Sequence, residues 1–312
     1  MTRAENPSRL RAVLAYAGVS LALLLGVGAA YKSYRPWIEL ETKWETANRY
    51  LEAGDFDQAI ASYKEILEIK PDLATARHDL GLAYIRKGLY DEAIAAFKQT
   101  IEVGQAPETR AMAHFNLGVI YTNKELYEEA ITSFKKALEN RPNFADASQG
   151  LGLAYMNNGV NDKAITAFKQ AIEAQAIEAS REPELRATAY YNLGLIYAKT
   201  HIYDEAIDSL DKSLRFQPND PDIYDLLGDC YRVKGLYEKA IGAYQRALEL
   251  RPDFAETQAG LGYAYEDSGL YDQAIAAYQN ALKSKPDDET MREDLKRVSM
   301  KRSGGAKNGR VK

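Results

Sequence analysis

The stretch AETQAGLGYAYEDSGLYDQAIAAYQNALKSKPDD, residues 255–288, is the clearest of seven copies of one 34-residue pattern. In this copy the pair Leu261-Gly262 is followed three residues after the glycine by Tyr265, and nine residues later by Ala274. Equivalent pairs recur as Leu80-Gly81, Leu117-Gly118, Leu151-Gly152, Leu193-Gly194 and Leu227-Gly228. A first, weaker copy carries Thr46-Ala47 instead. A repeat of this length predicts stacked two-helix units, which form an extended binding surface rather than a catalytic pocket.

Residue types within the copy indicate where its two helices begin and end. Gly269 closes the first helix, called helix A below, before a turn. The second helix, helix B, starts near Asp272, whose carboxylate suits a helix N-terminus. Pro286 ends helix B, because proline cannot continue the backbone hydrogen bonds. Small residues at Gly262 and Ala274 predict a close approach of the two helices.

These residues resemble the tetratricopeptide repeat family, and the resemblance covers residues 40–286, about four fifths of the chain. The resemblance implies an all-α fold: a right-handed α-solenoid, or superhelix, of seven antiparallel helix pairs. The repeats are expected at 40–73, 74–110, 111–144, 145–186, 187–220, 221–254 and 255–288. A polar helix at 289–298 is expected to follow as the solvating cap that such arrays need.

The period is broken twice, after the second and the fourth copies. The spacing grows from 34 to 37 residues through residues 104–110, and to 42 residues through residues 174–183. Neither place has the proline that usually ends helix B. The second insert is rich in Ala, Glu and Ile, so we expect it to prolong helix B by two turns before Pro183. A longer helix could contact a partner or change the pitch of the superhelix, and tolerance of a longer loop is the alternative.

The beginning of the chain predicts a membrane anchor. Residues 12–31 carry no charge, and a helix of this length spans roughly 30 Å, the thickness of a hydrocarbon core. We therefore expect a transmembrane helix at 12–31, between a short basic tail at 1–11 and a juxtamembrane linker at 32–39. A cleavable signal peptide is the alternative, because Gly28 and Ala30 fit a small-x-small cleavage site. The expected localisation is single-pass, in a bacterial inner membrane, with the repeats outside the cytoplasm.

Small residues recur every four positions along this segment, at Gly18, Ala22, Gly26 and Ala30. That spacing lets two membrane helices approach closely, so it predicts self-association or contact with another membrane helix. The general richness of membrane helices in Gly and Ala is the alternative explanation.

The end of the chain is basic, although most of the repeats are acidic. Residues 292–312 hold eight Lys or Arg and two Asp or Glu, whereas residues 44–291 hold 26 and 40. Residues 299–312 show no apolar period, so we expect a disordered basic tail there. Such a tail could contact anionic lipid or nucleic acid, or be only a solvated end.

In the tetratricopeptide family, helix A residues that are not used for packing line a concave groove, and the resemblance implies one here. The expected partner-binding groove contains His78, Leu82, Phe115, Asn116, Val119, Asn123, Leu153, Met156, Asn157, Tyr191, Asn192, Leu195, Lys199, Asp225, Asp229, Arg232 and Glu266. Its middle is apolar with Asn side chains, which suit the backbone of an extended peptide. Its C-terminal third is acidic, which favours a ligand with Lys or Arg.

Nothing in the sequence indicates catalysis. The histidines His78, His114 and His201 lie in different copies, and no phosphate-binding loop or nucleophile motif is present. Cys230 is the only cysteine, so no intrachain disulfide forms. No metal and no cofactor is expected.

We therefore expect a non-enzymatic, membrane-anchored scaffold or adaptor. It is expected to bind protein or peptide partners in the groove and to support complex assembly at the membrane. The alternative is a self-assembling structural oligomer, organised through the anchor helix and the ends of the array. Nucleic acid is not an expected partner of the repeats.

Overall fold

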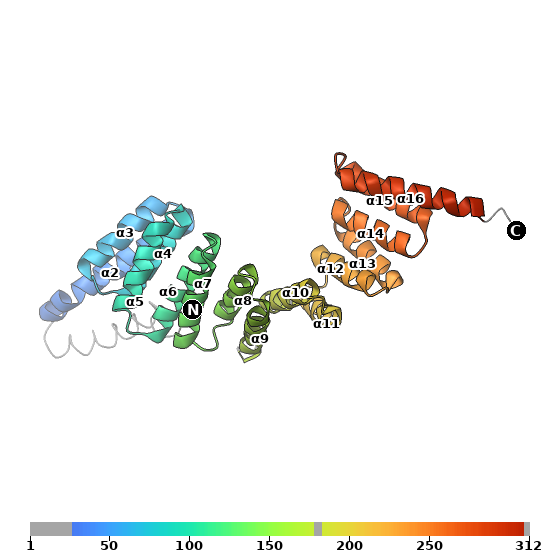
Figure 1. Ribbon diagram of the computed structural model, residues 1–312. Helices are drawn as coiled ribbons and strands as arrows, with labels where there is room; N and C mark the ends of the chain where they lie inside the picture. Colours follow the sequence, from blue (N-terminus) through green and yellow to red (C-terminus); the bar gives the residue numbers. More distant parts are fainter. Residues whose placement is uncertain (1–26, 178–182, 309–312) are drawn as a thin grey trace. The chain divides into compact units, whose positions relative to one another are not determined.

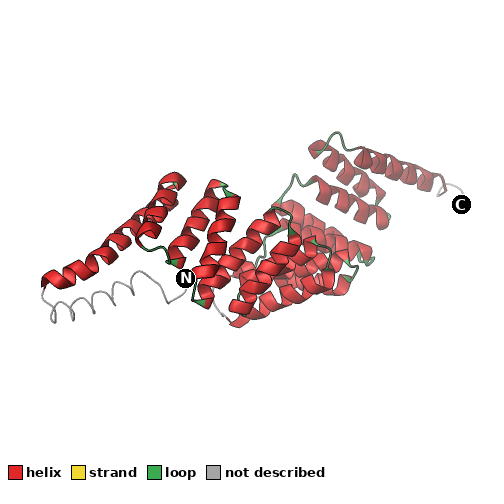
Figure 2. Ribbon diagram, turned by 60° about the vertical axis from the view of Figure 1, so that its left-hand side comes forward, coloured by secondary structure: helices red, strands yellow, loops and turns green. Residues whose placement is uncertain are grey.

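Helices make up all the regular structure in the residues that the computed structural model describes, 27–177 and 183–308. Figure 1 shows these fifteen α-helices in chain order, and Figure 2 shows the loops between them. The prediction of an all-α fold is confirmed, since neither described range contains a strand. The chain divides into two compact units, Met1–Ala154 (unit 1) and Tyr155–Lys312 (unit 2).

Unit 1 is built of helix pairs. Its helices are α2 (Val27–Ala53), α3 (Phe56–Ile69), α4 (Ala74–Lys87), α5 (Tyr90–Val103), α6 (Pro107–Asn123) and α7 (Tyr127–Asn140), and α8 (Ala145–Asn157) crosses the boundary to unit 2. Even-numbered helices up to α14 are the helices A of the seven copies, and odd-numbered ones are the helices B. Within unit 1, the helices α2, α4 and α6 contact their own helices B most extensively, namely α3, α5 and α7.

Unit 2 continues the same arrangement. Its helices are α9 (Asn161–Ile177), α10 (Pro183–Lys199), α11 (Tyr203–Leu214), α12 (Pro221–Val233), α13 (Tyr237–Leu250), α14 (Ala255–Asp267), α15 (Tyr271–Ser284) and α16 (Glu289–Asn308). The pairs are α10 with α11, α12 with α13, and α14 with α15, and α16 packs on α15.

A large helix B side chain packs against the glycine of helix A in most pairs. Phe134 is 1% exposed, and a Cβ added at Gly118 would lie 2.7 Å from its ring. In unit 2, a Cβ added at Gly228 would lie 2.5 Å from the Tyr244 ring. Glycine at these positions therefore allows the two helices to approach this closely.

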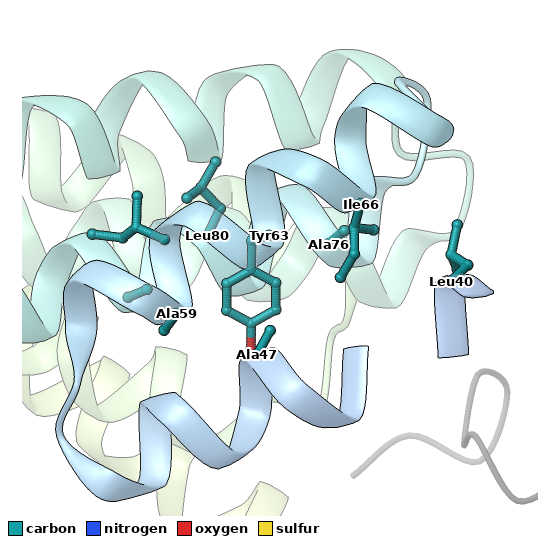
Figure 3. Packing of buried hydrophobic residues seen from close by; sticks show 9 residues of the cluster. Leu40, Ala47, Ala59, Tyr63, Ile66, Ala76 and Leu80 are labelled. Carbon is teal, nitrogen blue, oxygen red and sulfur yellow. The ribbon is translucent and has the colours of Figure 1, made fainter. Parts of the chain in front are cut away.

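The first copy shows the same packing with alanine in place of glycine (Figure 3). Tyr63 of α3 is fully buried and points toward Ala47 of α2. Ile66 of α3 lies beside Ala76 of α4, so the cluster also joins the first copy to the second. Burial of a side chain such as Ile66 stabilises the fold by about 1.5–3 kcal/mol.

The turn after helix A has a left-handed backbone in every copy. Gly269 has a φ of 76°, which glycine adopts without steric cost. In the third and fifth copies, the equivalent residues are Glu125 and His201, with φ of 59° and 62°. A side chain in this conformation costs about 1 kcal/mol, so these two turns are strained relative to the others.

The expected single-pass membrane localisation is contradicted. No helix within residues 27–177 and 183–308 is long and apolar enough to span a bilayer. Residues 27–31 of the expected anchor belong to α2, which continues through the charged residues Lys32 and Arg35. Residues 12–26, with Gly18, Ala22 and Gly26 of the small-residue stripe, lie outside the described residues, and Ala30 belongs to the first turn of α2.

Two segments at the ends of the array belong to long helices. Residues 32–39, the expected juxtamembrane linker, belong to α2, which is 27 residues long. The capping helix begins at the expected residue, Glu289, but continues to Asn308 through most of the expected disordered tail. Ion pairs that join Lys301 and Arg302 to the last repeat explain why the helix continues.

The two inserts lengthen helix A of the copy that follows each of them. Both α6 and α10 have 17 residues and begin at a proline, Pro107 and Pro183, whereas α12 has 13 residues. Before the second insert, α9 also has 17 residues, compared with 14 in α7. Within the described residues, helix B is thus extended by less than the two expected turns, up to Ile177, and residues 178–182 are not described.

Candidate functional site

In unit 1, the predicted residues His78 and Asn116 lie together. Asn116 Nδ2 on α6 is 2.9 Å from His78 Nε2 on α4, and His78 Nδ1 is 3.2 Å from Asp79 Oδ1. Asn116 is only 9% exposed. This polar pair therefore joins two neighbouring copies, and its groups are engaged within the protein.

The same helix face also presents apolar side chains. The ring centroid of Phe115 lies 5.9 Å from that of Phe134 and 5.1 Å from that of Phe144. The half-buried apolar residues predicted for this face are Leu82, Val119 and Leu153, and Asn123 is exposed at the end of α6. Half-buried apolar side chains that are grouped on one face, with an exposed amide beside them, are typical of a protein-binding surface.

In unit 2 the face begins with a similar mixture of side chains. Met156, Tyr191 and Leu195 are half-buried, Asn192 is 6% exposed, and Asn157 and Lys199 are exposed. Burial raises the pKa of the Tyr191 hydroxyl, and the carboxylates of Asp222, Asp220 and Asp225 on or beside α12 act in the same direction. Tyr191 therefore borders the acidic part of the face.

The acidic part lies on α12, where Asp225 has an unusual environment. Burial raises the pKa of Asp225 to about 6, the carboxylates of Asp229 and Asp222 add to the shift, and the neighbouring Thr257 hydroxyl opposes it. Asp225 forms no ion pair with any described residue, whereas Asp222 accepts two hydrogen bonds from Arg251, of 2.9 and 3.0 Å. Asp225 therefore lies among other carboxylates and has no cationic partner among the described residues.

Asp229 and Arg232 lie next to the buried side chain of Tyr244. The Tyr244 hydroxyl donates a hydrogen bond of 2.6 Å to Asp229 Oδ1. Arg232 Nη1 lies 3.4 Å from Asp267 Oδ2, and its guanidinium carbon lies 5.5 Å from the Tyr263 ring centroid. Both predicted residues thus have partners within unit 2.

In the first and sixth copies, the helix A residue fifteen positions before the buried tyrosine of helix B accepts its hydrogen bond. Tyr63 donates to Asn48 at 2.6 Å, as Tyr244 does to Asp229, and both pairs are fifteen residues apart. Where helix B carries phenylalanine, at Phe97, Phe134 and Phe168, the equivalent residues are Leu82, Val119 and Leu153. A buried hydroxyl requires an acceptor, so the tyrosine copies place a polar group on the helix A face.

Glu266 is not part of an open groove, and this corrects the expectation. Its side chain is 6% exposed because α16 covers it. Arg297 Nη2 and Lys301 Nζ of α16 lie 2.8 and 2.9 Å from its carboxylate, and the Tyr278 hydroxyl donates to it at 3.1 Å. These partners lower the pKa of Glu266 to about 2, with Arg297 the largest cause. The physical reason for the correction is that α16 is a basic helix that neutralises the last acidic residue of the face.

Two residues on or beside this face were missed from the sequence. Asn48 in the first copy was missed, although the combination of Asn48 with Tyr63 at the fifteen-residue spacing signals it. Asp294 of α16, whose carboxylate accepts a hydrogen bond from the Tyr263 hydroxyl of α14, was also missed. No local signal identifies Asp294, because it lies 31 positions from Tyr263.

This face offers apolar surface, amide groups and carboxylates. Among the residues that the structure describes, no group of three or more His, Cys, Asp or Glu could hold a metal ion.

Family comparisons agree with the helix pairs. Profiles described as tetratricopeptide repeat match residues 72–143, 149–221 and 255–288, and a profile described as TPR repeat matches residues 47–88 and 228–269. A search of curated protein sequences gives no match.

Solved structures share the architecture. The MamA protein is 28% identical over 56% of this chain and 92% of its own chain, with a TM-score of 0.51. YrrB, described as a TPR protein with an unusual peptide-binding site, is 22% identical over 65% of this chain and 99% of its own, with a TM-score of 0.55. Part of a TPR repeat-containing protein from Cytophaga hutchinsonii is 18% identical over 80% of this chain and 98% of its own, with a TM-score of 0.65.

Proteins of this kind are generally protein-interaction scaffolds. The profiles match most of the chain between residues 47 and 288, over the same helix pairs that the structure shows. The chain therefore belongs to the tetratricopeptide repeat family.

Proposed function

We propose that the helix A face binds polypeptide segments that combine apolar side chains with Lys or Arg, and that the protein thereby assembles its partners into a complex. The observation that carries this proposal is the environment of Asp225 on α12. Its carboxylate is partly buried among other acids and has no ion-pair partner among the described residues. A ligand cation would lower the free energy of this carboxylate more than that of a fully solvated one.

The apolar residues of unit 1 supply the other part of the proposed recognition. Leu82, Val119 and the Phe115 ring are half-buried, and the neighbouring Asn123 is exposed. Apolar side chains of a ligand would remove this surface from water, which stabilises a complex by roughly 25 cal/mol per Å². An amide donates and accepts hydrogen bonds, so Asn123 suits a peptide backbone.

Site-specific photo-crosslinking tests this proposal. A photoreactive phenylalanine analogue at Asn123, on the helix A face, is expected to capture partner polypeptides from a native lysate. The same analogue at Ala95, which is exposed on helix B, is the matched control and is expected to capture none of them. Capture of the same polypeptides at both positions would show that binding does not use helix A.

A second variant tests the acidic part of the face. Asp225→Asn is expected to reduce the yield of polypeptides captured by the same analogue at Lys199, which is exposed on a helix A of the same unit, and the loss should be largest at low salt because the interaction is electrostatic. An unchanged yield and salt dependence with Asp225→Asn would contradict the role of the acidic part. Exposed Asp267, which already pairs with Arg232, provides the control substitution Asp267→Asn.

A further inference from the structure

Two equivalent clefts lie away from the helix A face, one in each unit. The first has a volume of about 510 Å³ and lies among α5, α6 and α7 of unit 1. The second has a volume of about 380 Å³ and lies among α9, α10 and α11 of unit 2. Both volumes are in the range of ligand-binding pockets. None of the residues that form the helix A face lines either cleft.

The two clefts have the same lining at equivalent positions of the repeat. One wall is a helix B with Lys98, Ile101 and Glu102 in the first cleft, and Lys169, Ile172 and Glu173 in the second. In both, the lysine directly follows the buried phenylalanine of helix B. The next helix A contributes a tyrosine and the next helix B a lysine: Tyr121 and Lys136, and Tyr197 and Lys212. The same site thus occurs twice in the chain.

Both clefts lie at junctions where the period is broken. At three of the four regular junctions between copies, and before α16, a side chain of the following helix donates a hydrogen bond to the carbonyl of the loop proline six residues earlier. Tyr224 donates to the Pro218 carbonyl at 3.1 Å and Gln258 to the Pro252 carbonyl at 2.7 Å. Arg77 and Arg292 contact Pro71 and Pro286 in the same way. These contacts fold long side chains over the junction between copies.

The third and fifth copies, which follow the two inserts, lack this arrangement. The equivalent side chains are His114 and Tyr190, and each lines a cleft. The proline before each of them has moved into the first turn of helix A, seven residues earlier, at Pro107 and Pro183. No loop proline carbonyl is then in position to hold the side chain. Each of the two clefts therefore lies at a junction that follows an insert and lacks the proline contact.

The charges of the clefts define what they could bind. Lys98, Glu102 and Glu129 in the first cleft form no ion pair with any described residue, and neither do Lys169, Glu173 and Glu205 in the second. Each cleft thus offers free charges of both signs around an isoleucine, a leucine and a tyrosine. A group of one charge would be attracted by some of these residues and repelled by others.

We propose that each cleft binds a polypeptide segment in which an apolar side chain is flanked by one acidic and one basic residue. The apolar side chain contacts Ile101 or Ile172, and the flanking charges pair with the free lysine and glutamate of the same wall. The protein therefore has two further binding sites of one specificity, one on each unit, in addition to the helix A face.

The isoleucines provide reporters for a direct test. The full chain with 13C-labelled isoleucine methyl groups is titrated with the capped peptide acetyl-Ala-Lys-Leu-Glu-Ala-amide. Saturable shifts are expected at Ile101 and Ile172, and none at the fully buried Ile66 and Ile223. The peptide with glycine in place of leucine is expected to bind at least tenfold more weakly, since it lacks the apolar side chain.

Matched lysine variants make each cleft its own control. Lys98→Glu is expected to weaken binding at Ile101 by at least about fivefold and to leave Ile172 unchanged, and Lys169→Glu should do the reverse. Lys64→Glu is the control, because Lys64 has the equivalent position at the regular first junction, where it lies 5.9 Å from the Tyr84 ring centroid. Equal binding of both peptides, shifts at only one of the two isoleucines, or equal effects of Lys98→Glu and Lys64→Glu would overturn the proposal.

Discussion

The second copy, in unit 1, and the sixth copy, in unit 2, use the same helix pair with a different ring at its centre. In unit 1, Phe97 is fully buried and the helix A residue beside it is Leu82. In unit 2, Tyr244 is equally buried, but its hydroxyl donates to Asp229 at 2.6 Å. The difference teaches that the buried ring determines the character of the surface next to it. An apolar ring permits an apolar helix A face, whereas a tyrosine requires an acceptor there.

The carboxylates of the acidic face consequently differ in what they do. Asp229 and Glu266 accept hydrogen bonds from buried tyrosines, and Glu266 also attaches α16. Asp225 has neither role and retains a raised pKa. Acidic residues that look alike in the sequence therefore divide into two that stabilise the fold and one that is available to a ligand.

The largest effect is expected from Glu266→Ala. This change leaves the buried Tyr278 hydroxyl without its acceptor and removes the anion that Arg297 and Lys301 contact. The side chains of Arg297 and Lys301 are 45% and 51% exposed, so water replaces part of the interaction that they lose with Glu266. We expect a cost of about 3 kcal/mol in the local free energy of opening of α15 and α16. Hydrogen exchange of their amides measures it.

The neighbouring variant Asp267→Ala is the control. Asp267 is exposed and its one ion pair, with Arg232, has a distance of 3.4 Å. Its loss should cost less than about 1 kcal/mol. If the two variants changed the exchange of α16 equally, Glu266 would not be its attachment point.

Acid should release α16 from the wild-type chain. The pKa of Glu266 is lowered from 4.5 to about 2, so the folded state favours its ionised form. The resulting stabilisation is fully present above pH 4.5 and is lost as the pH falls toward 2. Hydrogen exchange of α16 over this range measures the release. Protection that stayed constant from pH 4.5 to 2 would contradict the attachment.

Replacing a buried phenylalanine by tyrosine should test whether the buried ring determines the helix A residue next to it. Phe134→Tyr places a hydroxyl beside Val119, whose side chain offers no acceptor, and should cost about 2 kcal/mol in urea unfolding. Adding Val119→Asp supplies the acceptor at the same fifteen-residue spacing and should recover at least half of that loss. No recovery in the double variant would show that the pairing of ring and surface residue does not transfer between units.

The smallest effect is expected for Asp225→Asn. The pKa of Asp225 is raised from 3.8 to about 6, so ionisation destabilises the folded state as the pH rises between these values. At pH 7 the variant should therefore be more stable than wild type by about 1–2 kcal/mol, and below pH 3.8 the difference should vanish. Urea unfolding at the two pH values measures it. A variant that is less stable at pH 7 would contradict the raised pKa.

The sequence predicts most of the repeat because its determinants are local. The Leu-Gly pairs mark the close approach of helices, and the glycine in the turn, such as Gly269, marks the left-handed backbone. Glu289 is also correctly predicted as the start of the last helix. Each of these features depends on neighbouring residues in the chain.

The incorrect and missing predictions concern contacts between distant residues. The helical continuation of α16 depends on ion pairs between residues 31 and 35 positions apart, which no local pattern reveals. The uncharged run at 12–31 predicted an anchor, but the helix that contains residues 27–31 is charged and continues into the first repeat. The clefts lie at the two junctions that follow the inserts, which the sequence showed only as changes in spacing.

The specificity of the helix A face is the central claim, and selection from a random peptide library displayed on phage tests it most directly. The wild-type chain is predicted to enrich peptides that combine apolar residues with Lys or Arg. Val119→Asp should reduce the apolar preference, and Asp225→Asn should reduce the basic one. Enrichment that had no preferred composition, or a preference that both variants left unchanged, would contradict the account.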